Sequence, residues 1–428
     1  MPIRPRHHVR VLRLSQQYRR RVLFIAGGVG AGLAASLFAL LADKAQALFG
    51  LATAHVSWFG YVAAPIGFAV LAYATQRFAP TARGSGIPQG IAALQVKDDP
   101  HIDSLLSLPI AGAKVLLTLL ALVCGASVGR EGPTVQIAAS VMVSLRRFVK
   151  VDKNALILGG SAAGIAAAFN APLAGIVFSI EELSRSFESK TSGLVLTTTI
   201  IAGLTATAVT GNYTYFGFAT GEMGTAADWA ALIVIAIAGG SLGGLFSLFV
   251  IRFSQLRAWQ DLVLRNRYPI LFAFGCGVIT SLCALFSGGM TFGAGYGQAY
   301  AFIHENAVAP FYFVPLKMLA TAAATISGIA GGLFAPSLSI GAGLGSMIAP
   351  LFNVASIGEC ALLGMAAYLT GVLQSPITAV VIMAEMTDNP RMVVPLMACA
   401  FVADQVSKAI CKQSLYHSLA QGFVPAKA

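Results

Sequence analysis

Charged residues are scarce in this chain. Asp, Glu, Lys and Arg together make up 11% of its 428 residues, whereas 57% are hydrophobic. A soluble globular domain normally carries about 25% charged residues, so this scarcity excludes a soluble protein and predicts an integral membrane protein. Acidic residues are the rarer kind, 17 against 28 basic ones, which leaves a formal net charge of +11.

Motifs of metal, redox and nucleotide chemistry are also missing. The six cysteines include no CxxC pair, so we interpret them as packing thiols without a disulfide framework or a metal cluster. His304 and Glu305 precede Asn-Ala-Val and therefore fail the HExxH pattern, and the glycines of 30-GAGLAA are better explained by close helix packing than by nucleotide binding. No nucleophile, base and orienting group stand together, so we predict no enzyme and no cofactor.

Apolar runs fill nearly the whole chain instead. An α-helix needs about 20 apolar residues to cross the hydrocarbon core of a membrane. Runs of about this length stand at 22–42, 58–78, 104–128, 154–180, 193–211, 228–251, 269–287, 311–330, 359–384 and 392–411. We therefore expect one all-α transmembrane domain over 22–412 and a short cytoplasmic tail over 413–428, without room for soluble regulatory CBS domains.

The first 21 residues are basic, with arginine at positions 4, 6, 10, 13, 19, 20 and 21. The positive-inside rule places this segment, 1–21, in the cytoplasm of a cell whose inner membrane holds the protein. A nucleic-acid-binding arm is an alternative, but the segment lacks interleaved aromatic residues and leads straight into a span. A cleaved signal peptide ending at 45-AQA-47 is another, but the apolar run at 22–42 is too long for it.

The chain contains an internal repeat with a period of about 204 residues. The segment 170-NAPLAGIVFSIEEL-183 returns as 374-QSPITAVVIMAEMT-387, and 132-GPTVQIAAS-140 returns as 335-APSLSIGAG-343. We therefore expect two membrane repeats, at about 22–211 and 228–412. Such repeats are typical of transporters, whose ion sites lie on broken helices at the interface between the repeats.

Glycine followed by proline interrupts the apolar runs in 84-GSGIP-88, 129-GREGP-133 and 331-GGLFAP-336. Proline is favoured at the start of a helix, so we expect each proline to open a helix whose N-terminus is exposed at membrane depth. Exposed backbone N–H groups and the positive end of the helix dipole form an anion site. Converging helix ends bind an anion weakly enough to release it again, which favours a transported anion.

Side chains at these helix ends refine the hypothesis. Ser85 offers a hydroxyl donor to the anion. Glu131 is costly at bilayer depth, and we interpret it as a gate: the ionised carboxylate occupies the place of the anion, and the protonated one withdraws and admits it. The alternative is a structural ion pair between Arg130 and Glu131.

These segments together resemble the CLC family of chloride channels and chloride/proton antiporters over nearly the full chain. The signatures are GSGIP at 84–88, GREGPTVQ at 129–136, GLFAP at 332–336, AAAFNAPLAGIVFSIEEL at 166–183, AEMTDN at 384–389 and a tyrosine in 414-SLYHS-418. The resemblance implies a CLC-type fold of two inverted-topology repeats, and a homodimer in which each subunit has its own pore.

The resemblance also implies roles for particular residues. Glu131 is the external gate, Glu182 is the internal proton relay, and Glu181 lies beside it in the water path. Lys114 biases the pore toward anions, or alternatively snorkels near the end of a span. Chloride is bound by hydroxyls and backbone amides of Ser85, Gly86, Ile87, Arg130, Gly132, Leu333, Phe334 and Tyr416.

Two functions remain open at this point, and departures from the family pattern bear on them. A chloride/proton antiporter needs an inner proton acceptor, which Glu182 supplies, whereas a passive voltage- or pH-gated chloride channel needs only the gate. The segment 89-QGIAALQ-95 lacks acidic residues that bacterial antiporters often carry there, which puts a secondary proton contact in doubt. Ser85 favours chloride over nitrate, and the altered signatures of fluoride exporters are absent.

Overall fold

Helices make up almost all of the regular structure. The computed structural model describes residues 6–148, 151–184, 189–211, 214–218, 223–255, 268–352, 354 and 356–425. Within these residues the only β-structure is a pair of isolated bridges, and eight helices are long and apolar enough to cross a membrane. The expected all-α membrane architecture is therefore present.

The helices fall into two groups of similar order. The first group comprises α1 (Arg6–His55), α2 (Phe59–Phe78), α3 (Ile87–Gln95), α4 (Asp99–Leu105), α5 (Leu108–Val123), α6 (Glu131–Ser144), α7 (Lys153–Phe169), α8 (Pro172–Phe178) and α9 (Ser189–Thr210). The second comprises α10 (Ala226–Gln255), α12 (Pro269–Phe286), α13 (Tyr296–His304), α14 (Phe313–Ser327), α15 (Phe334–Ile348), α16 (Ile357–Leu373), α17 (Pro376–Thr387), α18 (Val393–Ile410) and the short α19 (Leu415–Ala420).

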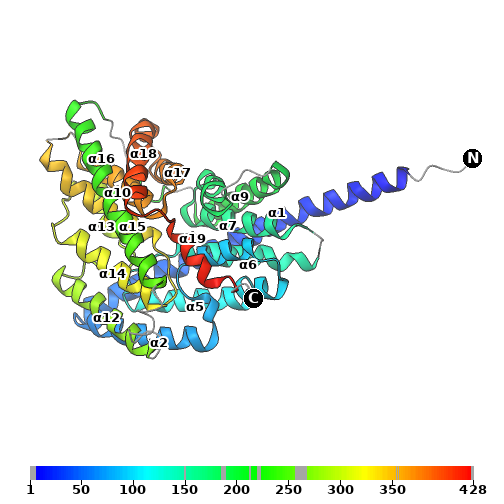
Figure 1. Ribbon diagram of the computed structural model, residues 1–428, viewed down its shortest axis with the longest axis horizontal. Coiled ribbons are helices and arrows are strands. Elements are labelled where there is room, and N and C mark those ends of the chain that lie inside the picture. Colours follow the sequence, from blue (N-terminus) through cyan, green and yellow to red (C-terminus); the bar gives the residue numbers. More distant parts are fainter. Residues whose placement is uncertain are drawn as a thin grey trace, which may run out of the picture.

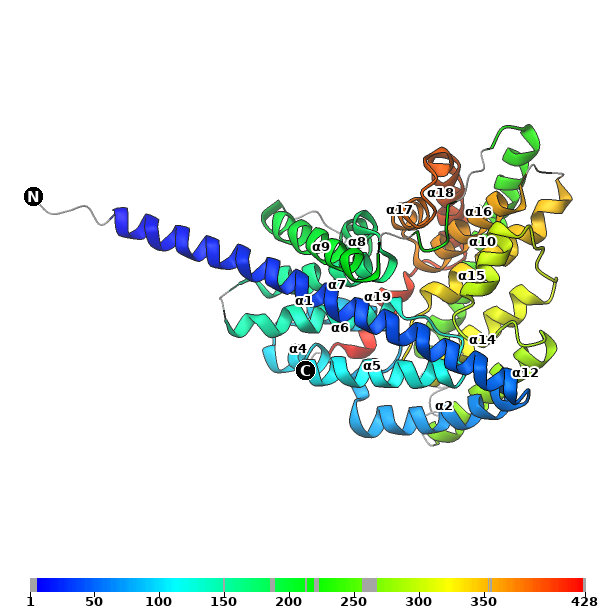
Figure 2. The ribbon, with the colours of Figure 1, turned by 180° about the vertical axis from the view of Figure 1, so that it is seen from behind.

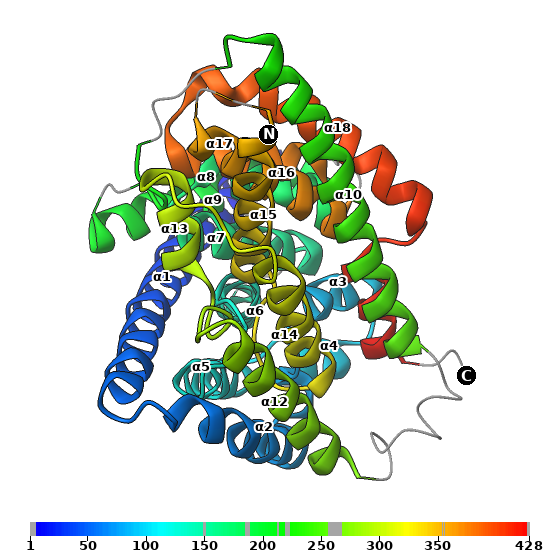
Figure 3. The ribbon, with the colours of Figure 1, turned by 90° about the vertical axis from the view of Figure 1, so that its left-hand side faces the viewer.

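The two groups lie side by side, and α19 returns to the first group (Figure 1). Seen from behind, α1 runs past α5 and α6 and extends beyond the body of the molecule toward the N-terminus (Figure 2). From the side, α15 and α14 of the second group lie in front of α6, and α10 flanks them (Figure 3). The interface between the groups therefore contains α6, α15 and α19.

Two of the predicted spans are wrong as continuous helices. The run 154–180 divides into α7 and α8 at Asn170, and the run 359–384 divides into α16 and α17 at Gln374. Both residues adopt left-handed backbone conformations, with φ of 53° and 59°, and a proline follows two positions later in each case. Because proline disfavours a helical conformation in the residue before it, each span ends and a new helix begins.

Helix starts also differ from the prediction at two of the three breaks. α3 begins at Ile87 with Pro88 in its first turn, as expected. α6 and α15, however, begin at Glu131 and Phe334, which are two residues before the prolines that were predicted to open them. The first turn of α6 therefore includes the glutamate itself.

Glycines bring the central helices of the second group into close contact. A Cβ atom added to Gly345 of α15 would lie 1.8 Å from the carbonyl oxygen of Cys360 in α16. A Cβ added to Gly364 of α16 would lie 2.1 Å from the carbonyl oxygen of Gly341 in α15. Small residues permit this approach of two helix backbones, so α15 packs directly against α16.

Candidate functional site

The three glycine-rich breaks meet in the middle of the molecule. Gly84 and Gly331 are joined by a hydrogen bond from the Gly331 N–H to the Gly84 carbonyl, 3.0 Å long. Gly129 and Gly332 exchange two backbone hydrogen bonds of 2.7 and 2.8 Å. The starts of α3, α6 and α15 are thereby fixed to one another, as the sequence predicted for a site at the interface between the repeats.

Close backbone approach at this junction requires glycine at two positions. Gly86 has φ of 114°, a conformation that side chains disfavour, and a Cβ there would lie 2.6 Å from the Gly132 carbonyl oxygen. At Gly132, a Cβ would lie 2.1 Å from the Ser85 hydroxyl oxygen. The missing side chains therefore leave room for the Ser85 hydroxyl beside the first turn of α6.

Two buried hydroxyls face each other across the junction. Ser85 is 6% exposed and Tyr416 of α19 is fully buried. The two side chains are close enough to interact, and within the described residues neither hydroxyl oxygen has a hydrogen-bond partner of good geometry. Buried hydroxyls are normally hydrogen-bonded, so this pair has unused capacity to donate to a ligand at this place.

Aromatic rings enclose the junction on the side of α15. The Phe334 ring stacks on the Tyr416 ring, with centroids 6.2 Å apart, and also contacts the rings of Phe169 and Phe178. Leu333 and Ile87 are buried as well. The start of α15 is thus shielded from bulk solvent, and shielding strengthens electrostatic interactions with its N–H groups.

Glu131 places its carboxylate at the N-terminus of α15. The side chain is fully buried, and the Ala335 N–H donates to its Oε2 at 3.4 Å. The Tyr215 hydroxyl donates to its Oε1 at 3.5 Å. A negative group at the positive end of a helix is stabilised by the helix dipole, and a bound anion would compete for the same N–H groups.

Arg130 has a different partner from the one that the structural alternative required. Its guanidinium donates to Asp43 Oδ1 at 2.5 Å and to the carbonyl oxygen of Ala39 at 2.7 Å, both in α1. Within the described residues, the ion pair of Arg130 is therefore with Asp43 and not with Glu131. The arginine side chain binds α6 to α1, and its guanidinium also lies over the ring of Tyr215.

Lys114 is buried below the same junction. Its Nζ donates to the carbonyl oxygens of Ala82 and Gly84 at 2.8 and 2.6 Å, and the residue is completely inaccessible to solvent. It therefore does not snorkel toward the end of a span. The lysine holds the backbone that carries Ser85, and it places a basic group close to the point where the helix ends meet.

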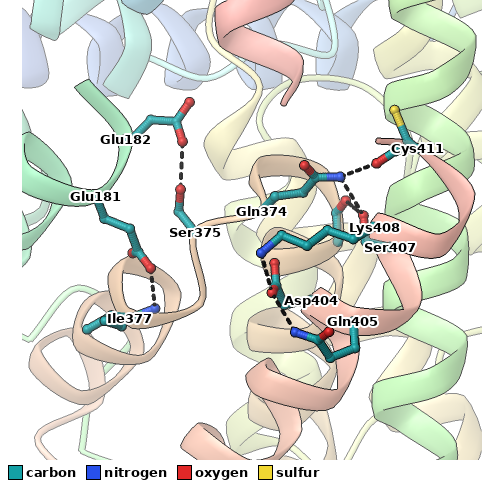
Figure 4. A network of polar contacts seen from close by, with 11 residues as sticks. Glu181, Glu182, Gln374, Ser375, Ile377, Asp404, Gln405, Ser407, Lys408 and Cys411 are labelled. Atoms are coloured by element: carbon teal, nitrogen blue, oxygen red, sulfur yellow. Dashed lines mark hydrogen bonds and ion pairs between the residues drawn. The ribbon is translucent and has the colours of Figure 1, made fainter. Parts of the chain in front are cut away.

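Glu182 lies in a π-helical turn, Ser179–Ser184, that follows α8. It is fully buried, and hydroxyls of two serines donate to its carboxylate, Ser375 at 2.6 Å and Ser414 at 3.4 Å. Figure 4 shows Glu182 directed at Ser375, which lies in the break between α16 and α17. A π-helical turn is frequent at functional sites, and here it directs a carboxylate into the protein near α19.

Glu181 has a partner that the sequence did not suggest. Its carboxylate accepts the N–H groups of Ile377 and Thr378 at 3.1 and 2.6 Å, together with the Thr378 hydroxyl at 2.7 Å. In Figure 4 it points toward the start of α17, away from Glu182. This carboxylate caps a helix, whereas the resemblance implied a place beside Glu182 in a water path.

Several contacts at the site could not be found from the sequence motifs. The Ala335 N–H, the Tyr215 hydroxyl and the serine donors to Glu182 come from segments distant in sequence, and no local pattern marks them. Lys317 is different, because it lies 203 residues after Lys114, close to the period of the repeat, which would have indicated it. Its Nζ donates to the carbonyl oxygens of Thr291 and Gly293.

Known proteins resemble this chain over most of its length. The family model described as voltage gated chloride channel matches residues 66–408, which is most of the chain. The chain belongs to this family. The protein from Cronobacter sakazakii named H(+)/Cl(-) exchange transporter ClcA is 31% identical over 421 residues, covering 92% of this chain and 87% of its own. The protein of the same name from Yersinia pestis is 28% identical over 430 residues, covering 92% and 85%.

Solved structures of family members share the fold. A slow cyanobacterial Cl-/H+ antiporter superposes with a TM-score of 0.79 at 24% identity, covering 94% of this chain and 97% of its own. A CLC-type fluoride/proton antiporter also gives a TM-score of 0.79, at 22% identity, covering 92% and 96%. The prediction of a CLC-type membrane fold from the glycine signatures is confirmed.

Proposed function

We propose that this chain is an antiporter that exchanges chloride for protons across a membrane. The observation that carries the proposal is the position of Glu131, whose carboxylate occupies the N-terminus of α15 beside the uncommitted hydroxyls of Ser85 and Tyr416. The relatives named H(+)/Cl(-) exchange transporter support the same activity.

The exchange follows from competition between two anions for one helix end. While Glu131 is ionised, its carboxylate binds at the Ala335 N–H and excludes chloride. Protonation removes the negative charge and therefore the attraction to the helix dipole. The side chain then leaves, and chloride enters. Chloride receives hydrogen bonds from the hydroxyls of Ser85 and Tyr416. The backbone amides that complete the site are those of Gly86, Ile87, Arg130, Gly132, Leu333 and Phe334. One group thus responds to both substrates.

Glu182 gives the proton an acceptor on the inner side and distinguishes an antiporter from a channel. A buried carboxylate with two serine donors is stabilised in its ionised form, and it remains able to accept a proton. A passive chloride channel, the second candidate function, needs no such group. We assign Glu182 as the relay and Lys114 as a group that biases the pathway toward anions.

The remaining features of the proposal concern location and assembly. We propose a multi-pass protein of the inner membrane with both termini cytoplasmic, and the arginines before Val22 support the cytoplasmic position of the N-terminus. It is proposed to form a homodimer with one ion pathway in each subunit, and to work without a metal or nucleotide cofactor. Cross-linking in lipid that yields only monomers would contradict the dimer.

Proton uptake driven by a chloride gradient tests the proposal in vesicles that contain purified protein. The membrane potential is clamped with valinomycin and potassium, and chloride and proton fluxes are recorded together. Glu131→Gln mimics the protonated gate, so chloride should still pass while proton movement stops. Glu182→Gln keeps the gate and removes the relay, so proton movement should stop while chloride flux remains pH-dependent.

Three outcomes separate the candidate functions. Wild-type protein that moves chloride but no protons would replace the antiporter with the channel. Normal proton uptake by Glu182→Gln would retain the antiporter and reject the relay assignment. Fluoride or nitrate flux faster than chloride flux would reject the assignment of Ser85 as a chloride-selective donor.

A further inference from the structure

Tyr215 is a second partner of the Glu131 carboxylate, at the oxygen atom that the Ala335 N–H does not contact. It lies in the segment that connects the two helical groups and is 6% exposed. Its hydroxyl donates to Glu131 Oε1 at 3.5 Å, while the Ala335 N–H donates to Oε2. The carboxylate is thereby held between a helix end and a phenol.

Contacts on several sides fix the Tyr215 ring. The Arg130 guanidinium lies 5.6 Å from the centre of the ring, and the rings of Phe169, Phe216 and Tyr296 pack against it with centroids 5.2–6.0 Å away. The Tyr296 hydroxyl donates to the Tyr215 carbonyl oxygen at 2.7 Å. A ring held in this way keeps its hydroxyl at one place without a further loss of conformational freedom.

The backbone next to Tyr215 is fixed as well. The Phe216 N–H donates to the Met386 carbonyl oxygen at 3.1 Å, at the end of α17, and the Phe216 ring stacks on Tyr296 of α13. His304 Nε2 forms a short contact with the Phe216 carbonyl oxygen. Residues 214–218 are therefore anchored to two helices of the second group, and Tyr215 lies against the start of α6 in the first.

We propose that Tyr215 is a positioning residue that holds the ionised Glu131 side chain in its chloride-excluding position and thereby slows the opening of the gate. The inference rests on the proposed role of Glu131 as gate. A hydrogen bond to a charged acceptor is stronger than one to a neutral acceptor, so the hold is greatest while the carboxylate is ionised and weakens on protonation. Chloride must break this contact, as well as the one to Ala335, before it can enter.

The test compares Tyr215→Phe with wild type in chloride flux from vesicles at a fixed pH. The substitution removes the hydroxyl and retains the ring, including its packing against Arg130 and Phe169. Turnover should rise roughly tenfold, the factor that corresponds to the weak end of the range for a hydrogen bond to a charged group, because the contact is 3.5 Å long. Tyr300→Phe is the matched control, because Tyr300 belongs to the same aromatic cluster through its contact with Tyr296; its turnover should stay within about twofold of wild type.

A second pair of variants separates positioning from a general structural effect. In a Glu131→Ala background the side chain that Tyr215 holds is missing, so adding Tyr215→Phe should leave the chloride flux unchanged. Equal acceleration in both backgrounds would overturn the inference, and so would unchanged or slower turnover in Tyr215→Phe alone. If Glu131→Gln still moves protons, the gate assignment itself fails, and this result is independent of Tyr215.

Discussion

The two halves of the chain share a common arrangement of helices and backbone contacts, but they differ in the titratable side chains that they carry. Lys114 and Lys317 occupy equivalent positions, and each donates to two backbone carbonyl oxygens of the glycine-rich loop in its own half. Glu181 and Glu385 are equivalent too, but each caps a helix of the other half: Glu181 binds the start of α17, and Glu385 accepts from two N–H groups at the start of α8. The halves are therefore related by a local two-fold axis.

The residues assigned to transport break this symmetry. At the position equivalent to Glu131 the second half has Phe334, and at the position equivalent to Glu182 it has Met386. The internal repeat accounts for the lysine contacts and the helix caps, because both halves use the same backbone geometry at these positions. One ion pathway needs one gate and one relay, so the titratable groups of our proposal occur only in the first half.

The largest effect is expected when the first half is made to resemble the second at the relay. Glu182→Met introduces the residue that the second half already has, and it should abolish chloride-driven proton uptake because no titratable group remains at that position. Chloride flux should persist, since the helix ends and Glu131 are unchanged. Proton uptake above one tenth of the wild-type rate would show that the asymmetry at this position is unimportant for coupling. Monodispersity in detergent serves as the check on folding.

The arrangement of the helices could be predicted from the sequence more fully than the contacts between side chains at the site. The repeat and the three glycine breaks depend on local composition, and the structure brings these breaks together by backbone hydrogen bonds between Gly84, Gly129, Gly331 and Gly332. Hydropathy alone failed at Asn170 and Gln374, because a single left-handed residue interrupts a helix without making the run less apolar. The proline two positions later was the available signal.

Partners of the two carboxylates could not be predicted because tertiary folding brings them together. Tyr215 lies 84 positions from Glu131, and Ser375 lies 193 positions from Glu182. The contacts of Glu181 could not be predicted from the sequence either. The resemblance implied that Glu181 lies beside Glu182 in the water path, whereas the π-helical turn directs Glu182 inward and leaves Glu181 facing α17.

Replacement of either lysine is expected to have a smaller effect, with a loss of stability in both variants and a loss of chloride affinity in only one. Lys114→Met removes the lysine donor from the carbonyl oxygens of Ala82 and Gly84, of which Gly84 keeps a backbone donor, and Lys317→Met removes it from two carbonyl oxygens of the other half. An unsatisfied buried acceptor costs about 1–3 kcal/mol. Both variants should unfold at a lower temperature in detergent. Only Lys114→Met should also weaken chloride binding in calorimetry, because its loop carries Ser85. Equal loss of chloride affinity in both variants would contradict a difference between the halves.

The smallest effect is expected at the exchanged helix caps, where the halves are most alike. Glu181→Gln and Glu385→Gln keep an acceptor oxygen but remove the charge, and a charge at a helix N-terminus contributes about 0.3–1 kcal/mol. The two variants should therefore lower the unfolding temperature by similar, small amounts. Proton coupling should remain at the wild-type ratio in both, because each carboxylate is engaged with backbone N–H groups. Loss of proton coupling in Glu181→Gln alone would show that Glu181 takes part in proton transfer. The two helix caps would then differ in function, and only the two lysines would have the same role in both halves.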